Sequence, residues 1–299
     1  MLSPVMQTGG TLVADEVMDD DVIVGDTIFT DGFNLTIEEG TSLEFDTNGV
    51  IVAEGGNFIC GDISGSSVNL TGTSEWNGIT LIDCDTVKIY KTNIEDIKDS
   101  AYAIDMYNCD EIEMQYNTFT IDNSGAVRGS YTTTSMNPLI VLFENTFDVS
   151  GNNIPILNFG ASSSSSVPII VDNCWFYAPT SSSSSAINIT NISGAAIKNC
   201  EITNYYSPVI TLSSSIDLYN NEITTSTVYC SIYGSSGSNL NMTPGIYTLN
   251  AGYNGIINSD DDAHNVYVDG SYFIVDGGNN AFDISGSYDA GKHFTGYFP

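Results

Sequence analysis

The sequence predicts an all-β protein, a single-stranded parallel β-helix (solenoid) of about nine to eleven coils. Three observations predict it. Apolar and polar residues alternate along much of the chain, which is typical of half-buried strands. A short element, in which Asn or Cys stands just before an apolar residue, recurs at intervals of 21 to 29 residues. Ser, Thr, Asn and Gly fill the segments between, so the repeating unit is a set of short strands and turns.

The chain is expected to form one domain after a short N-terminal segment. Residues 1–20 are polar with scattered apolar positions, and we interpret them as a lead-in or cap. The parallel β-helix domain then covers residues 21–299, including a C-terminal cap. A single coil cannot bury its own apolar face, so neighbouring coils must stack at the strand spacing of roughly 4.8 Å.

The recurring element predicts a ladder of small side chains inside the solenoid. An amide that recurs once per coil can hydrogen-bond to its neighbour in the next coil and to the turn backbone. Cysteine fits the same position as a small side chain that is easily buried. The expected members of the ladder are Asn93, Asn117, Asn145, Cys174, Cys200 and Asn221.

Low-complexity segments interrupt the repeat at residues 123–137, 161–166 and 180–185. Runs of Ser and Gly at one phase of the repeat predict loops that leave the solenoid along one edge. The phase is harder to follow after Ser226, and the segments near residues 272–284 are expected to supply the final coils or a cap. Such a cap would cover the open sheet edge at the end of a solenoid.

Two stretches resemble a known superfamily. Residues 34–45 (NLTIEEGTSLEF) look like an entry coil of the pectin-lyase-like superfamily, and Trp76-Asn77-Gly78-Ile79 resembles its W-x-G-I coil. The repeated Asn is similar to the asparagine ladder of that superfamily. The resemblance covers roughly residues 20–290 and implies a right-handed single-stranded parallel β-helix of the bacterial or archaeal extracellular, non-catalytic type. It does not fix the activity, because this superfamily includes lyases, hydrolases, adhesins, phage spikes and surface repeats.

The charge balance is strongly acidic. The chain has 6 Lys and Arg against 37 Asp and Glu, a net charge of -31. Such a surface repels nucleic acid and anionic membranes and offers carboxylates to divalent cations. Calcium is therefore the one ion that the composition favours, with the acidic runs as candidate ligands and solvated turns as the alternative. These runs are Asp19, Asp20 and Asp21, and Asp260, Asp261 and Asp262.

Candidate catalytic residues are few. Arg128 is the only arginine and lies in a Ser/Thr-rich segment without a lyase motif. Asp85 and Asp110 are one coil apart and are expected to stack, where two carboxylates repel unless a proton or a cation lies between them. The alternative is a polar turn that faces solvent. We therefore expect no catalytic residues, with Asp85 and Asp110 as the acidic pair to examine.

The six cysteines include no C-x-x-C pair, and neither histidine is near a cysteine in sequence. A zinc site or a Cys-His nucleophile is therefore not expected. Cys84 and Cys109, like Cys174 and Cys200, are about one coil apart, which leaves cross-coil disulfides open. We favour reduced, buried ladder cysteines.

The leading hypothesis is a non-catalytic extracellular structural protein, a cell-surface or adhesin-like rod that could also assemble head-to-tail into a fibre. A first alternative is a β-helix protein that binds or cleaves carbohydrate through Asp pairs, and a second is a phage or secretion-associated spike. Surface glycans or further copies of the chain are the expected partners, whereas nucleic acid is not. We do not interpret residues 1–6 as a signal peptide, because a basic segment followed by an apolar one is missing there, and no apolar run of about 20 residues could cross a membrane.

Overall fold

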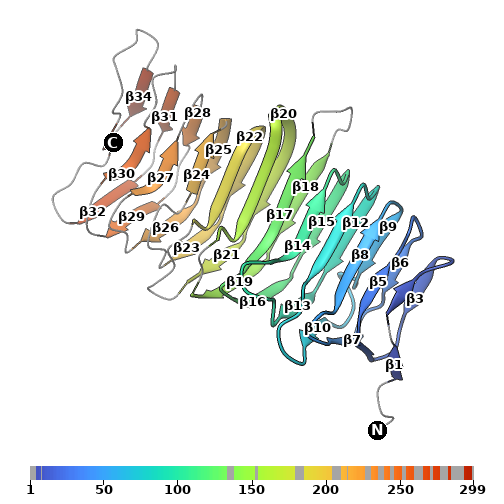
Figure 1. Cartoon of the computed structure of the whole chain (residues 1–299). Coiled ribbons are helices and arrows are strands. Elements are labelled where there is room, and N and C mark those ends of the chain that lie inside the picture. The colour runs from blue at the N-terminus through green and yellow to red at the C-terminus, as the bar shows by residue number, and fades with distance from the viewer. Residues whose placement is uncertain are drawn as a thin grey trace.

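The structure is a computed structural model. It describes the backbone of residues 5–7, 9–132, 138–151, 154–178, 185–203, 210–213 and 215–225, and of eight strands beyond residue 229. Side chains are described for residues 9–132, 138–151, 154–162, 166–178, 185–203 and 216–223. All regular structure in these ranges is β-strand, and every strand pairing is parallel. The strands stack coil upon coil along the molecule, so the predicted parallel β-helix is confirmed (Figure 1).

Each coil contributes strands to three faces, which we name A, B and C. Face A is a 12-stranded parallel sheet. Its strands in order are β1 (Val5–Gln7), β4 (Val22–Val24), β7 (Ser42–Phe45), β10 (Val68–Gly72), β13 (Thr92–Glu95), β16 (Thr118–Asp122), β19 (Thr146–Ser150), β21 (Trp175–Tyr177), β23 (Glu201–Thr203), β26 (Glu222–Thr225), β29 (Ile246–Asn250) and β32 (Tyr272–Asp276). The repeat period predicted nine to eleven coils for residues 21–299, and the first of the 12 strands, β1, lies in the segment expected as a lead-in.

Faces B and C together form a 22-stranded sheet. Face B contains β2 (Gly10–Thr11), β5 (Thr27–Phe29), β8 (Val50–Glu54), β11 (Ile79–Ile82), β14 (Tyr102–Tyr107), β17 (Gly125–Tyr131), β24 (Ile210–Ser213), β27 (Cys230–Gly234), β30 (Asn254–Asn258) and β33 (Phe282–Asp283). Face C contains β3 (Glu16–Met18), β6 (Leu35–Ile37), β9 (Asn57–Cys60), β12 (Thr86–Tyr90), β15 (Glu111–Gln115), β18 (Leu139–Phe143), β25 (Ser215–Tyr219), β28 (Asn239–Met242), β31 (Asn265–Asp269) and β34 (His293–Tyr297). The segment expected as a lead-in thus already contains β2 and β3, which pair with β5 and β6.

Two long strands join faces B and C. β20 (Leu157–Asp172) pairs with β17 through its first half and with β18 through its second, and β22 (Ile187–Lys198) continues both faces. The serine run at residues 161–166 therefore lies within β20, and the prediction of a loop there is wrong. Within the run, Ala161 pairs with Tyr131 of the preceding coil, and Ser165 and Ser166 pair with Ile192 and Ser193 of the following coil, an extension that the weak strand propensity of serine would not predict.

The core consists of the inward-facing half of each strand. The burial pattern alternates along the strands, as in β16 and β19. Under face A, the rings of Phe119, Phe147 and Phe176 stack in consecutive coils with centroids 5.1 and 4.7 Å apart. Nearer the N-terminus, the buried Trp76 stacks on Phe45 at 4.0 Å. Equivalent positions thus repeat the same contact, which is the packing that the sequence periodicity implies.

The corner between faces C and A is a tight turn with a fixed backbone conformation. One residue per coil has a left-handed φ there, between 45° and 60°, at Lys91, Tyr116, Glu144, Asn173, Asn199 and Asn220. Asparagine tolerates this conformation better than most residues because its short side chain can hydrogen-bond locally. The residue after the turn then points into the solenoid, which places the polar ladder.

Candidate functional site

A ladder of small side chains runs along the inside of the C–A corner. Asn117, Asn145, Cys174, Cys200 and Asn221 each follow the left-handed residue of their coil and are buried. In the preceding coil this position is held by the buried Thr92, not by Asn93. Asn93 is half-buried on the outside of β13, where its amide donates to Asn69 Oδ1 at 2.9 Å. The expected ladder is thus corrected by one residue in that coil.

The two central asparagines bind each other and the backbone of adjacent coils. Asn145 Oδ1 accepts from the backbone N–H of Asn117 at 3.0 Å and from Asn117 Nδ2 at 2.9 Å. Asn117 Nδ2 also donates to the carbonyl of Ile89, and Asn145 Nδ2 donates to that of Met114. These bonds satisfy buried backbone groups that the turn leaves without sheet partners.

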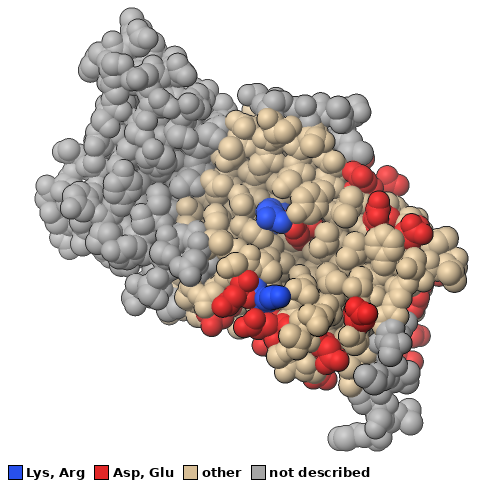
Figure 2. Space-filling view, in the orientation of Figure 1, with Lys and Arg blue, Asp and Glu red and all other residues tan. Residues whose placement is uncertain are grey.

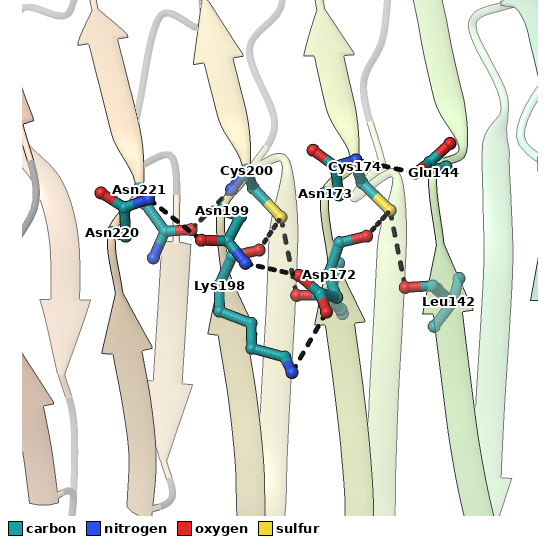
Figure 3. A network of polar contacts seen from close by, with 11 residues as sticks. Leu142, Glu144, Asp172, Asn173, Cys174, Lys198, Asn199, Cys200, Asn220 and Asn221 are labelled. Atoms are coloured by element: carbon teal, nitrogen blue, oxygen red, sulfur yellow. Dashed lines mark hydrogen bonds and ion pairs between the residues drawn. The ribbon is translucent and has the colours of Figure 1, made fainter.

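The ladder continues with cysteines in the two following coils (Figure 3). Cys174 Sγ lies 3.6 Å from the carbonyl oxygen of Leu142, and Cys200 Sγ lies 3.2 Å from that of Lys198. Asn221 then resumes the asparagine pattern, since its Oδ1 accepts from the backbone N–H of Cys200 at 3.0 Å. Both thiols are free, and burial beside Cys174 raises the pKa of Cys200 well above its ordinary value. The sulfur atoms here are buried packing groups rather than exposed nucleophiles.

A second line of amides lies outside the same corner. Asn220 Nδ2 donates to Asn199 Oδ1 at 3.0 Å, and Asn199 Nδ2 donates to Asp172 Oδ1 at 2.8 Å. Lys198 Nζ lies 3.1 Å from the other oxygen of Asp172 (Figure 3). One coil away, Asn173 Nδ2 donates to Glu144 Oε1 at 3.1 Å. The outer amides are thus held in place by one another and face solvent at one side.

A shallow recess opens beside this outer line. It has a volume of about 320 Å³ and is lined by the amides of Asn173, Asn199 and Asn220 and by side chains of face A. Those face A side chains are Trp175, Glu201 and Glu222, which are in register on β21, β23 and β26. Trp175 is 39% exposed. This recess was not predicted, and the signal for it is the outward-facing aromatic residues Trp175 and Tyr177 on either side of the buried Phe176.

Arg128 lies in a separate cluster on face B. Its guanidinium forms a two-point ion pair with the carboxylate of Asp105 in the neighbouring coil, with Nε 2.7 Å from Oδ1. It also donates to the Tyr107 hydroxyl at 2.8 Å and lies 5.1 Å from the Tyr102 ring centroid. The hydrogen bonds to Asp105 raise the pKa of Arg128.

On the face that Figure 2 shows, charged groups are sparse at the centre and acidic side chains gather towards the margins.

The acidic pair Asp85 and Asp110 lies at the corner between faces B and C. The residues that follow them, Thr86 and Glu111, pair in register, so the two aspartates are stacked as expected. Asp85 is exposed, whereas Asp110 is half-buried and its Oδ1 is a buried atom without a hydrogen-bond partner. The pair therefore combines one solvated carboxylate with one partly enclosed carboxylate.

The first run of calcium candidates, residues 19–21, belongs to no metal-binding group in the described part of the chain. Asp19, Asp20 and Asp21 are exposed, and Asp21 Oδ1 accepts from the backbone N–H of Ser42 at 2.9 Å. Within the ranges whose side chains are described, no group of three or more His, Cys, Asp or Glu residues could hold a metal ion. The second acidic run, Asp260, Asp261 and Asp262, lies outside the described residues.

Known protein families, curated proteins and solved structures contain no match to this chain. Membership of the pectin-lyase-like superfamily thus stays a prediction from the resemblance, while the β-helix itself is observed. Within the described residues, no helix is long and apolar enough to cross a membrane.

Proposed function

We propose that this protein is a non-catalytic extracellular structural protein, a cell-surface or adhesin-like β-helical rod. One observation carries this proposal: the repeated polar side chains of the C–A corner are committed to holding coils together. Asn117 and Asn145 bind each other and backbone groups of adjacent coils, and Asn221 binds two backbone groups of the coil before it. Such a ladder stabilises a persistent elongated shape, which a rod-like structural protein requires.

The state of the one arginine supports the same proposal. A catalytic arginine in a lyase must be able to contact the substrate, so its guanidinium cannot be fully engaged with other side chains. Arg128 is instead bound to both carboxylate oxygens of Asp105 and to the Tyr107 hydroxyl. Its role in this arrangement is to join β14 and β17 across neighbouring coils.

The proposal is tested on intact cells of the source organism. Antibody labelling and mild surface proteolysis are expected to reach the protein without lysis, and light scattering of the purified chain reports whether it grows into a fibre. A trimer in solution would favour the spike hypothesis instead. A protein that is labelled only after lysis would contradict the surface role.

Carbohydrate cleavage is the second candidate function, and a reducing-end assay on neutral and acidic polysaccharides tests it. The stacked pair Asp85 and Asp110 favours it, because one of the two carboxyl groups is partly enclosed. Activity that disappears in Asp110→Asn and persists in Asp148→Asn, a change at an exposed aspartate on face A, would establish this function over a structural role.

A further inference from the structure

We infer that the recess beside Trp175 binds an uncharged pyranose unit of a glycan. The inference deepens the adhesin-like role proposed above and rests on it for its biological setting. It places the contact surface at the C–A corner, on β21, β23 and β26. It does not use the acidic pair Asp85 and Asp110, which lies at a different corner of the coil.

The recess combines the two kinds of group that a sugar ring needs. Trp175 presents an aromatic surface to solvent on a rigid strand, held by pairing to Thr146 on one side and Glu201 on the other. The C–H groups on one face of a pyranose pack against such a ring, whose face carries partial negative charge. The partly exposed indole therefore offers a stacking surface at this point of face A.

Amides and carboxylates then line the rest of the recess. Asn199 and Asn220 each use an amide N–H within the corner network and carry a second one on the same nitrogen. Glu201 and Glu222 add acceptor oxygens in register one coil apart. Hydroxyl groups of a sugar are donors and acceptors at once, so a mixed wall of amides and carboxylates matches them.

The dimensions and charge narrow the class of ligand. The span from Trp175 to Glu222 covers two coil steps, or roughly 10 Å, which suits one or two sugar rings. The volume of about 320 Å³ is at the lower end of the range of small-molecule sites. Two neighbouring glutamates and a net charge of -31 repel uronic acids, sulfated sugars and nucleic acid. An uncharged pyranose satisfies all of these conditions.

Binding can be followed directly because the chain has 2 tryptophans and only one of the two is exposed. Trp76 is fully buried against Phe45, so a ligand in the recess is expected to change the emission of Trp175 alone. The probes are cellotetraose, maltotetraose, xylotetraose and chitotetraose, with trigalacturonate, choline and calcium chloride as competitors of other chemistry. Calorimetry supplies the affinities.

At least one neutral oligosaccharide is expected to bind saturably and to change the tryptophan emission, whereas trigalacturonate is not. Trp175→Ala is expected to weaken that binding by at least about tenfold, through loss of the stacking surface. Tyr177→Ala is the matched control, because it removes another exposed aromatic side chain, more exposed than Trp175, from the same strand outside the recess. Its affinity is expected to stay within about twofold of the parent.

Circular dichroism of both variants confirms that they fold, as is expected for changes at exposed side chains. The inference is overturned if none of the four neutral sugars binds, if the two alanine variants weaken binding equally, or if only choline or calcium binds at Trp175. Such a result would not contradict the proposed cell-surface location, because antibody labelling of intact cells tests that location separately. Conversely, sugar binding by a protein found inside cells would separate the site from the proposed setting.

Discussion

Asn145 Oδ1 accepts two hydrogen bonds from one residue of the adjacent coil, from the backbone N–H of Asn117 at 3.0 Å and from its Nδ2 at 2.9 Å. Since the Nδ2 of Asn145 donates in turn to the carbonyl of Met114, one buried side chain satisfies backbone groups on both sides of the turn at Tyr116. Asn117 and Asn221 repeat the backbone part of this relationship. Each Oδ1 accepts from the backbone N–H of the ladder residue in the adjacent coil, and each Nδ2 donates to a carbonyl of that coil. The ladder hydrogen bonds therefore join adjacent coils in the same direction as the hydrogen bonds between the parallel strands.

Asn145→Ala is expected to lower the free energy of unfolding by about 2–4 kcal/mol, because it strands the buried N–H of Asn117 and the carbonyl of Met114. Urea denaturation measures the loss. Asn93→Ala is the control: its amide bonds Asn69 at the half-buried surface, and we expect a cost below about 1 kcal/mol. Equal losses of unfolding free energy in the two variants would show that the buried ladder position contributes no more to stability than the half-buried one.

Gly78→Ala is expected to destabilise the protein by more than Gly32→Ala. Both glycines have a left-handed φ, of 79° and 88°, so both substitutions carry a backbone cost of about 1–2 kcal/mol. A Cβ on Gly78 would also lie 2.6 Å from the carbonyl oxygen of Tyr102, whereas one on Gly32 meets nothing within 4 Å. Thermal unfolding of the two variants isolates the contact between coils. Equal unfolding midpoint temperatures for the two variants would contradict the close contact between Gly78 and the carbonyl oxygen of Tyr102.

The fold could be predicted because the sequence periodicity corresponds directly to the repeating coils of the β-helix. Alternation sets which side chains face inward, and the recurring Asn or Cys sets the coil length, so a parallel β-helix could be predicted without further information. The error at Asn93 has an identifiable cause. From Asn117 to Phe119, and from Asn145 to Phe147, the ladder residue and the next inward residue are two positions apart. In the Asn93 coil the same parity selects Thr92 before the inward Ile94.

The recess and the Arg128 cluster could not be predicted in the same way. Both depend on which outward-facing residues lie side by side in neighbouring coils. Because the coils differ in length, the sequence alone does not give that register. Trp175 and Glu201 become neighbours only once β21 pairs with β23. The strand through the serine run at residues 161–166 was missed because serine has a weak strand propensity, and the run joins two paired segments of β20 whose partners lie on β17 and β18.

Stability is expected to fall with rising pH through the titration of Cys60. Burial raises the pKa of this thiol from 9.0 to about 12, so the folded protein keeps the proton after the unfolded chain has begun to lose it. The contribution is therefore complete below pH 9.0 and declines towards pH 12. One pH unit above the unfolded pKa the loss is about 1.4 kcal/mol.

Denaturation of the parent and of Cys60→Ala at about pH 8 and about pH 10 tests this dependence. The variant has one titrating thiol fewer and is expected to lose about 1.4 kcal/mol less between the two pH values. Its lower stability at the reference pH, which arises from the cavity, does not affect the difference. Parallel pH profiles for the two proteins would refute the assignment.

The two ladder cysteines, and the two cysteines at the corner between faces B and C, are expected to be reduced. Cys84, Cys109, Cys174 and Cys200 are buried free thiols in the structure, and their sulfurs are already packed against backbone carbonyls such as that of Leu142. Alkylation of the unfolded chain without reductant, followed by peptide mapping, is expected to modify all four. Alkylation of the folded chain should modify none of them, because burial denies the reagent access. A cross-linked peptide joining Cys174 and Cys200, or Cys84 and Cys109, would disprove it.

The ion pair between Arg128 and Asp105 is expected to couple two coils more strongly than the pair between Lys198 and Asp172. The two pairs are matched in exposure, with 37% and 15% for the first and 38% and 18% for the second. They differ in geometry, since the guanidinium binds both carboxylate oxygens and stacks on Tyr102, whereas the lysine makes one contact at 3.1 Å.

Double-mutant cycles measure the two couplings. Arg128→Met with Asp105→Asn is expected to give a coupling free energy of about 1–2 kcal/mol, because two-point hydrogen bonding adds to the charge attraction. The cycle of Lys198→Met with Asp172→Asn is expected to give no more than about 1 kcal/mol, the usual value for exposed pairs. Added salt should reduce the lysine coupling by the larger fraction, since that pair depends on charge alone. If both cycles gave the same value, Arg128 would contribute to the stack no more than an ordinary surface cation does.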